Sequence, residues 1–256
     1  MASTIGKVTL VGAGPGAADL LTVRAIRALQ SADVILFDAL ISDEVLDLAR
    51  REAKRMLVGK RGGRVSCKQE DINALMLKLA GQGKHVVRLK SGDPMIFGRA
   101  GEEIDQLKAA GIAVEVVPGV TSALAAAAQA QVSLTHRDHA QSVRFVTGHS
   151  REGKLPELDW DGLADQKTTL VVYMGGRTAA QFAQKLIEKG HRPGCPVMIF
   201  KSVSRPDYEA DQATLAALAE GCSSMDERPQ LIAIGEALSQ AEVVEPMYGQ
   251  STRLVC

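Results

Sequence analysis

Short apolar runs alternate with stretches of helical periodicity along the whole chain. Strands are predicted at residues 8–11, 34–37, 85–89 and 114–117, and again at 142–147, 168–174, 196–201 and 231–234. The run 34–37 is apolar throughout and the others are rich in apolar residues, which is typical of strands that are buried in a sheet. Helices are predicted between them, at residues 20–30, 72–79 and 178–189. This alternation indicates an α/β protein with largely parallel strands.

The helix signals and the order of the strands also predict the organisation of the chain. Asp19 or Thr22 is expected to cap the first helix, and Gly83 to end the second. The two sets of strands predict an N-terminal α/β lobe at residues 1–120 and a C-terminal α/β lobe at 121–256. We expect the Ala-rich segment 121–131 to join the lobes, with a cleft between them.

Composition narrows the class of ligand. The 256 residues are 46% hydrophobic, and 30 basic side chains balance 30 acidic ones, so there is no general attraction to nucleic acid or to an anionic membrane. No apolar run approaches the roughly 20 residues that span a bilayer, and the start lacks a signal-peptide pattern, so we expect a cytoplasmic protein with small-molecule ligands. The cysteines form no Cys-x-x-Cys pair, which favours free thiols: Cys67, Cys195, Cys222 and Cys256.

A glycine-rich turn follows the first predicted strand. Residues 11–17 read Val-Gly-Ala-Gly-Pro-Gly-Ala and loosely fit a dinucleotide-binding fingerprint, with Asp33 or Asp38 as its acidic partner. Pro15 argues against this interpretation, because it removes a backbone N–H where a pyrophosphate needs donors. A plain strand-to-helix turn remains the other alternative.

The segment at residues 87–99 carries the strongest sign of a ligand site. Its apolar strand runs into a turn in which Gly92 permits close approach to the backbone, followed by an aromatic side chain, Phe97, that we expect to be buried. Arg88, Lys90 and Arg99 are expected to place cations around this site. The segment therefore predicts a ligand-binding edge of the sheet.

Other polar positions have both a structural and a functional interpretation. Asp38 follows an apolar strand, where ligands bind in α/β sheets, but it also suits a helix cap or turn. The loop Val-Gly-Lys-Arg-Gly-Gly at 58–63 is either a cationic site or a solvated loop. Met174 ends an apolar strand and would ordinarily belong to the core. The three histidines nearby lack the companions of a zinc site, and we predict no metal: His136, His139 and His149.

The chain resembles the tetrapyrrole methylases, which take a methyl group from S-adenosylmethionine. The motifs that carry this resemblance occur in the family's order: 11–16 with Asp-Leu-Leu-Thr at 19–22, Val-Gly-Lys-Arg at 58–61, Lys-Gln-Glu-Asp-Ile-Asn at 68–73, Gly-Asp-Pro-Met-Ile-Phe-Gly-Arg at 92–99, Gly-Glu-Glu at 101–103, Val-Pro-Gly-Val-Thr-Ser at 117–122, Leu-Thr-His-Arg at 134–137, Gln-Ser-Val-Arg-Phe-Val-Thr-Gly-His at 141–149 and Val-Val-Tyr-Met-Gly at 171–175. The segments 134–137 and 141–149 most resemble the members that act on uroporphyrinogen III.

The resemblance implies the tetrapyrrole methylase fold, a homodimer, and methylation of uroporphyrinogen III at C2 and C7, giving precorrin-2 through precorrin-1. The product would serve cobalamin or sirohaem biosynthesis. The cofactor contacts it implies are Pro15, Ser91, Gly92, Asp93, Ile96, Thr121, Ser122, Met174 and Val203. The catalytic residues it implies are Asp38 as proton acceptor and Lys60 as proton donor, and the substrate contacts are Arg137, Arg61, Arg64 and Glu102. Glu102 is expected to steady one of these arginines or to touch a pyrrole N–H.

Several residues depart from the family pattern: Ser91 in place of a glycine, Ala39 in place of an arginine, Gln131-Val132-Ser133 in place of Gly-Ile-Pro, and Arg64 and Lys68 in place of histidine and proline. Ser91 adds a hydroxymethyl group close to the expected cofactor contacts. Two rival interpretations remain, a related methylase with another tetrapyrrole substrate and a nicotinamide oxidoreductase. The structural alternative for Arg137 is a salt bridge to Asp138 or a nearby glutamate.

Overall fold

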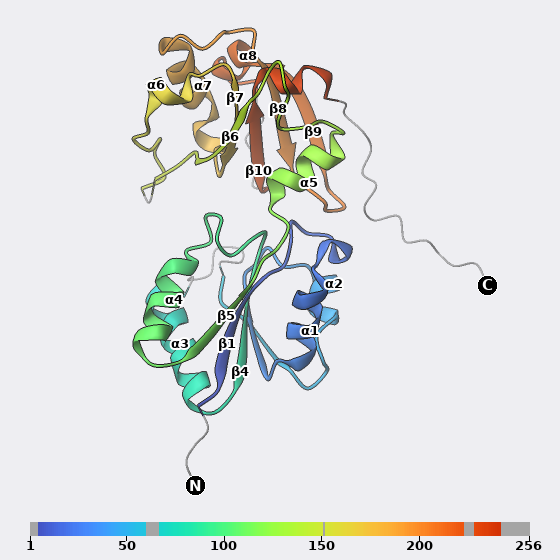
Figure 1. Cartoon of the computed structure of the whole chain (residues 1–256), viewed down its shortest axis with the longest axis vertical. Coiled ribbons are helices and arrows are strands. Elements are labelled where there is room, and N and C mark those ends of the chain that lie inside the picture. Colours follow the sequence, from blue (N-terminus) through green and yellow to red (C-terminus); the bar gives the residue numbers. More distant parts are fainter. Residues whose placement is uncertain (1–4, 60–66, 151, 223–227, 242–256) are drawn as a thin grey trace, which may run out of the picture. The chain divides into compact units, whose positions relative to one another are not determined.

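A computed structural model describes residues 5–59, 67–150, 152–222 and 228–241. Contacts within the chain divide it into two compact units between Thr121 and Ser122, and each unit is described by itself (Figure 1). No helix among the described residues is both long and apolar enough to cross a membrane. Cys67, Cys195 and Cys222 are free thiols, and Cys256 lies outside the described residues.

The N-terminal unit is built on a parallel five-stranded sheet. Its strands lie in the order β3-β2-β4-β1-β5, with these bounds: β1 Lys7–Gly12, β2 Val34–Phe37, β3 Lys54–Leu57, β4 His85–Lys90 and β5 Ala113–Val117. The register pairs Gly12 with Lys90 and Val11 with Val117. The carboxyl ends of β1, β4 and β5 therefore meet at one edge, which is where ligands bind in sheets of this kind.

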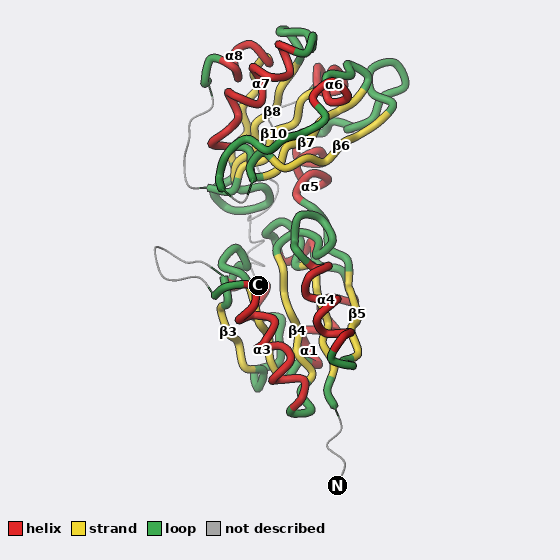
Figure 2. Tube along the Cα trace, turned by 90° about the vertical axis from the view of Figure 1, so that its left-hand side faces the viewer, coloured by secondary structure: helices red, strands yellow, loops and turns green. Residues whose placement is uncertain are grey.

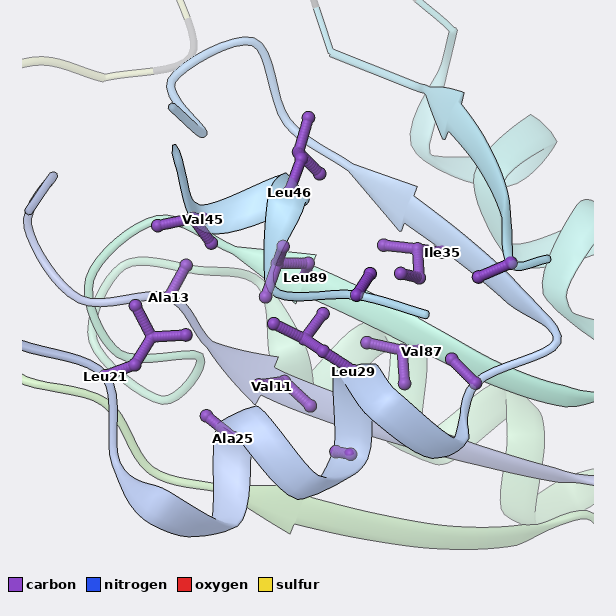
Figure 3. Close-up of a cluster of buried hydrophobic side chains, with 14 of the residues drawn as sticks. Val11, Ala13, Leu21, Ala25, Leu29, Ile35, Val45, Leu46, Val87 and Leu89 are labelled. Carbon is purple, nitrogen blue, oxygen red and sulfur yellow. The ribbon is translucent and has the colours of Figure 1, made fainter. Parts of the chain in front are cut away.

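Helices cover both faces of this sheet (Figure 1, Figure 2). They are α1 Val23–Ser31, α2 Asp43–Asp47, α3 Gln69–Gly81 and α4 Ala100–Ala109, with a 3-10 helix at Ala18–Leu20. Helices α1 and α2 pack Ala25, Leu29 and Val45 against Val11 and Val87 of the sheet (Figure 3). The alternate side chains of the strands pack against α3 and α4 on the other face.

The ends of these helices agree with the local sequence. Thr22 caps α1, because its hydroxyl accepts a hydrogen bond from Ala25 N at 3.1 Å. Asp19 lies instead in the preceding 3-10 turn. Gly83 has a φ of 77° just beyond α3, a left-handed conformation that favours glycine.

The C-terminal unit contains a mixed sheet, and here the expectation of largely parallel strands is wrong. The strand order is β6-β7-β10-β8-β9, with these bounds: β6 Ser142–Thr147, β7 Thr168–Tyr173, β8 Pro196–Lys201, β9 Glu209–Thr214 and β10 Gln230–Ile234. Only β6 and β7 pair in parallel, whereas β10 runs antiparallel to both of its neighbours and β9 runs antiparallel to β8. An apolar run marks a buried strand but does not indicate its direction.

Helices α6, α7 and α8 contribute side chains to one core of this sheet. The helices of the unit are α5 Ser122–Gln129, α6 Trp160–Leu163, α7 Ala179–Glu188 and α8 Leu215–Ala219, with 3-10 helices at Gly176–Thr178 and Glu236–Gln240. Phe182 and Leu186 of α7 pack with Leu215 of α8 and with Ile232 of the sheet. Phe182 also meets the ring of Trp160 edge-on, with ring centroids 5.1 Å apart.

Candidate functional site

Three glycine-containing turns converge at the carboxyl edge of the N-terminal sheet. Gly14 N donates to Gly92 O at 3.2 Å, and Gly92 N donates to Gly14 O at 2.7 Å, so the turn after β1 is joined to the turn after β4. A Cβ added at Gly12 would lie 2.5 Å from Gly119 N, and one added at Gly119 would lie 2.3 Å from Gly92 O. The turns therefore pack backbone against backbone, which only glycine permits at these points.

Gly92 differs from those two glycines, because one side of it is open within the N-terminal unit. Its φ is 67°, and a Cβ added there would meet only Thr121 Cα, at 4.0 Å. Ser91 is half-buried beside it, Thr121 is buried, and Pro15 is buried in the facing turn. A ligand can therefore approach the Gly92 backbone closely, as the sequence predicts.

Asp93 holds two of the turns together. Its Oδ1 accepts a hydrogen bond from Met95 N at 2.8 Å, and its Oδ2 accepts one from Gly119 N at 2.9 Å. Ile96 is half-buried and closes the same turn, since its N–H donates to Asp93 O at 3.3 Å. Both oxygens of Asp93 already have a partner, so the carboxylate shapes the turn. Its contact with a cofactor stays a prediction.

The expectation that Phe97 is buried is wrong, because its side chain is 42% exposed. The turn after Pro94 carries the ring outward, and Phe97 itself has a φ of 51°. Arg99, with a φ of 56°, forms two hydrogen bonds to the carboxylate of Glu102, at 2.8 and 2.6 Å. Arg99 is thus one partner of Glu102, and a contact of Glu102 with Arg61, Arg64 or Arg137 stays a prediction.

Asp38 lies just beyond β2 and forms an ion pair with Arg88. The carboxylate Oδ1 of Asp38 is 2.6 Å from a terminal nitrogen of Arg88. Arg88 and Lys90 are both buried, so they are not exposed cations around the site as expected; of the two, Arg88 reaches the site through its ion pair with Asp38. They bind Glu103 of α4, which is fully buried. Burial and the nearby Arg88 lower the pKa of Lys90 below its ordinary value.

Glu103 is the residue of this cluster that the sequence reasoning missed. The signal lay in Arg88 and Lys90, which stand two residues apart in a buried strand and so point to the same face. Two cations on a buried face require a nearby carboxylate, because an unpaired buried charge is very costly. The sequence does not say which of the many acidic residues supplies it.

Met174 is not part of the core, which corrects the ordinary interpretation of that position. Strand β7 ends at Tyr173, and Met174 turns out of it with a φ of 55° and an exposed fraction of 44%. His149 Nδ1 lies 2.9 Å from Met174 O, and Gly148 N donates to Tyr173 O at 2.7 Å. The loops after β6 and β7 are thus joined where Met174 is presented.

A second irregular loop in the C-terminal unit surrounds Val203. The residues on either side, Ser202 and Ser204, have φ values of 51° and 55°, and Val203 itself is buried. Ser204 N donates to Gln129 Oε1 at 3.0 Å, which ties this loop to α5, the helix that begins at Ser122. Backbone in the left-handed region at non-glycine residues costs about 1–3 kcal/mol and tends to occur at functional sites.

Arg137 lies in an exposed loop that the paired backbones of His136 and Ala140 close. The expected alternative, a salt bridge from Arg137 to Asp138, is not present, since His136 Nδ1 lies 3.9 Å from Asp138 Oδ2 instead. No carboxylate of the described residues forms an ion pair with Arg137. The rings of His136 and His139 stack with centroids 4.6 Å apart, and no metal-ligating group of three appears in the described part of the chain.

The structure thus brings together six of the predicted cofactor residues in the N-terminal unit, namely Pro15, Ser91, Gly92, Asp93, Ile96 and Thr121. Ser122, Met174 and Val203 belong to the C-terminal unit. Lys60, Arg61 and Arg64 lie outside the described residues.

Comparisons of the sequence and of the structure with known proteins point to the same family. The sequence model of the family described as Tetrapyrrole (Corrin/Porphyrin) Methylases matches residues 7–219. The chain is 50% identical over 235 residues to siroheme synthase 1 of Serratia proteamaculans (strain 568). The aligned region covers 92% of this chain and 49% of that protein. The chain therefore spans about half the length of the curated relatives it matches.

Solved structures similar to this chain include two methyltransferases. The uroporphyrin-III C-methyl transferase from Thermus thermophilus, complexed with S-adenyl homocysteine, has a TM-score of 0.79 and 40% sequence identity, covering 91% of this chain and 99% of that chain. A cobalt precorrin-4 methyltransferase from cobalamin biosynthesis has a TM-score of 0.78 and 30% identity, covering 91% of this chain and 95% of that chain.

Proposed function

Because the chain belongs to the tetrapyrrole methylases, we propose that it methylates uroporphyrinogen III at C2 and C7, giving precorrin-2 through precorrin-1. The similarity to the Thermus thermophilus enzyme over nearly the whole of that chain supports this substrate. The observation that carries the proposal is the combination of an open-sided glycine turn and a nearby ion-paired carboxylate. Gly92 provides the turn, and Asp38 provides the carboxylate at the same edge of the sheet.

The residues at the carboxyl edge fit S-adenosylmethionine as the methyl donor. A ligand can reach the Gly92 backbone because a Cβ there would meet only one atom, at 4.0 Å. The nicotinamide alternative loses its basis, since family membership assigns the glycine turn to a methylase and Pro15 lacks a backbone N–H at the position where a pyrophosphate would bind. S-adenosylmethionine supplies a methyl group that is already activated on a sulfonium.

The chain's own residues then position the substrate and move protons. A reduced pyrrole carbon is electron-rich, so positioning and proton transfer are the main tasks left to the protein. Asp38 is held by Arg88 at 2.6 Å and accepts a proton from the methylated macrocycle. Lys60 donates a proton in the same scheme, and it lies outside the described residues.

Substrate carboxylates need cations to bind them. Arg137 suits this role, because its guanidinium is exposed and no ion pair within the described residues engages it. A guanidinium binds a carboxylate through two parallel hydrogen bonds, which also sets the orientation of the substrate. Arg61 and Arg64 are proposed to assist it. Glu102 accepts two hydrogen bonds from Arg99, and its carboxylate is proposed to accept another from a pyrrole N–H of the substrate.

Incubation with uroporphyrinogen III and S-adenosylmethionine under anaerobic conditions tests the proposal. We expect mass spectrometry of the product to show a gain of two methyl groups. The similarity to the precorrin-4 enzyme keeps a related methylase as the second candidate function. Methylation of a later precorrin, with uroporphyrinogen III left unchanged, would favour that candidate.

We also propose a homodimer in the cytoplasm, with a product that serves sirohaem or cobalamin biosynthesis. The similarity to siroheme synthases and to a cobalamin-pathway methyltransferase supports both routes. Sedimentation equilibrium of the purified protein tests the dimer, and a mass of 27.2 kDa would contradict it, because that is the mass of a single chain.

A further inference from the structure

Helix α5 has few packing contacts of its own to fix its position within the C-terminal unit. Its buried apolar side chains are all alanines, namely Ala123, Ala125 and Ala126, and its large apolar side chain, Leu124, is 55% exposed. An alanine buries only one methyl group, so each of these contacts stabilises the helix weakly. A helix of eight residues is also unstable in isolation, so the position of α5 depends on bonds to other elements.

A hydrogen bond from the end of β7 holds the start of α5. Ala123 N donates to the hydroxyl oxygen of Tyr173 at 3.3 Å, and this N–H is one of the first four of the helix, which have no partner within it. Tyr173 is itself held, because its ring meets Phe145 edge-on with centroids 5.8 Å apart and its carbonyl accepts a hydrogen bond from Gly148 N. The start of α5 is therefore fixed to the residue that precedes Met174.

A second hydrogen bond ties the other end of α5 to the loop after β8. Gln129 is the last residue of the helix and is buried, and its Oε1 accepts a hydrogen bond from Ser204 N at 3.0 Å. A backbone N–H can only donate, so the amide oxygen must be the atom that faces Ser204. Gln129 Nε2 is buried and has no hydrogen-bond partner among the described residues, which costs free energy. The bond to Ser204 therefore decides the orientation of this side chain.

The two bonds reach loops whose backbone is in the left-handed region at residues other than glycine. Met174, Ser202 and Ser204 have φ values of 55°, 51° and 55°. Such conformations persist only where the surrounding structure holds them, and they tend to occur at functional sites. Each expected cofactor contact of the C-terminal unit is next in sequence to a residue of these bonds: Ser122 to Ala123, Met174 to Tyr173 and Val203 to Ser204.

We propose that Tyr173 and Gln129 are positioning residues for S-adenosylmethionine, because they fix α5 between the loops after β7 and β8 and so set the arrangement of Ser122, Met174 and Val203. The inference rests on the proposed function, with those three residues as cofactor contacts. The Tyr173 hydroxyl and the Gln129 amide oxygen act through the backbone N–H groups that they bind. Loss of either bond leaves α5 held at one end, so the binding of the cofactor must then order the three contacts, and affinity falls.

Two substitutions in the full-length protein remove one bond each and keep the shape of the side chain. Tyr173→Phe removes the hydroxyl, and Gln129→Met removes the amide oxygen. Each should raise the Kd for S-adenosylhomocysteine in titration calorimetry roughly three- to tenfold, the range that corresponds to one hydrogen bond. In methylation assays the KM for S-adenosylmethionine should rise by a larger factor than kcat falls, because the reacting groups themselves are unchanged.

Matched controls make the same chemical changes elsewhere in the C-terminal unit. Tyr208→Phe removes a buried hydroxyl that no described residue binds. Gln184→Met removes the hydrogen bond that Gln184 Nε2 donates to Ala219 O at 3.0 Å, which joins α7 to α8. Both controls should keep the wild-type Kd for S-adenosylhomocysteine, although Gln184→Met should unfold at a lower urea concentration. Their comparison with Tyr173→Phe and Gln129→Met separates a loss of positioning from a loss of stability.

The double variant Tyr173→Phe/Gln129→Met tests whether one helix transmits both effects. Because both bonds hold α5, the first loss already frees the helix and the second should add less. The fold-change in Kd of the double variant should therefore be smaller than the product of the two single fold-changes. A fold-change equal to that product would mean that the two residues act separately, and it would overturn the role of α5.

Wild-type Kd values in Tyr173→Phe and Gln129→Met, with lower melting temperatures, would give both residues a purely structural role and overturn the proposal. If Gln129→Met does not fold, the comparison of Tyr173→Phe with Tyr208→Phe decides between the two roles. The expected loss of affinity in a protein that does not methylate uroporphyrinogen III would support the positioning role and refute the proposed function. Normal methylation of uroporphyrinogen III with unchanged Kd and KM in both variants would do the reverse.

Discussion

Replacing Gly92 with alanine separates a defect in cofactor binding from a defect in folding. The residue has a φ of 67°, and its added Cβ would meet only Thr121 Cα, at 4.0 Å. The folded protein can therefore accommodate the methyl group, but that group occupies the space through which a ligand reaches the backbone. We expect Gly92→Ala to fold and to bind S-adenosylhomocysteine poorly.

The stability cost follows from the backbone conformation. A side chain in the left-handed region costs about 1–2 kcal/mol, so the free energy of unfolding should fall by that amount. Gly111 provides a matched control, because its φ is 70° and a Cβ there would meet no atom within 4 Å. Gly111→Ala should lose a similar free energy of unfolding, since it has the same backbone cost, while keeping the wild-type affinity for S-adenosylhomocysteine.

Titration calorimetry with S-adenosylhomocysteine and urea unfolding measure the two effects separately. We expect Gly92→Ala to weaken binding at least tenfold, which is about 1.4 kcal/mol, and Gly92→Leu to abolish binding that calorimetry can detect. NADH should not bind the wild-type protein. Wild-type affinity in Gly92→Ala would show that the cofactor does not approach through the open side of this turn.

The remaining predictions concern catalysis, substrate binding and pH. Asp38→Asn and Lys60→Met should keep the affinity for S-adenosylhomocysteine but slow single-turnover methyl transfer by about 10²–10⁴-fold, and unchanged rates would make Asp38 a turn former. Arg137→Lys should lower turnover and Arg137→Ala should lower it further, with little change in melting temperature, whereas early melting with normal turnover would indicate a structural role. His191 is buried, which lowers its pKa below the ordinary 6.5, so its neutral form is favoured in the folded protein. The unfolded chain takes up the proton first as the pH falls below 6.5, so stability should decrease there in urea unfolding, and His191→Phe should flatten that decrease.

The strands of the N-terminal unit could be predicted closely from sequence, and the reason is their burial. Strands β1, β2 and β4 lie in the interior of the sheet with helices on both faces, so their sequences are rich in apolar residues, although β4 also carries the buried Arg88 and Lys90. The edge strand β9 was missed because Glu209–Thr214 is polar and mostly exposed, and β3 was missed for a similar reason. The direction of β10 could not be predicted from the sequence, because it depends on which two strands lie beside β10 in the sheet.

The candidate site was predictable where the backbone itself imposes a residue type. Gly92 adopts a left-handed backbone conformation, and Asp93 accepts hydrogen bonds from backbone N–H groups of two turns. Each of these positions favours a particular residue type, which can be recognised in the sequence. Glu103 does not, because its partners lie on another element and only the folded chain brings them within 3.0–3.3 Å. Phe97 shows the opposite error, since an aromatic residue in an apolar segment was expected inside and the turn carries it outward.

Isotope labelling tests the proposal that this chain transfers methyl groups from S-adenosylmethionine to uroporphyrinogen III. The purified protein is incubated anaerobically with both compounds, with carbon-13 in the transferred methyl group, and the product is analysed by mass spectrometry and NMR. We expect two labelled methyl groups in the product, at C2 and C7. Unmodified uroporphyrinogen III, from a protein that nevertheless binds S-adenosylhomocysteine, would contradict it.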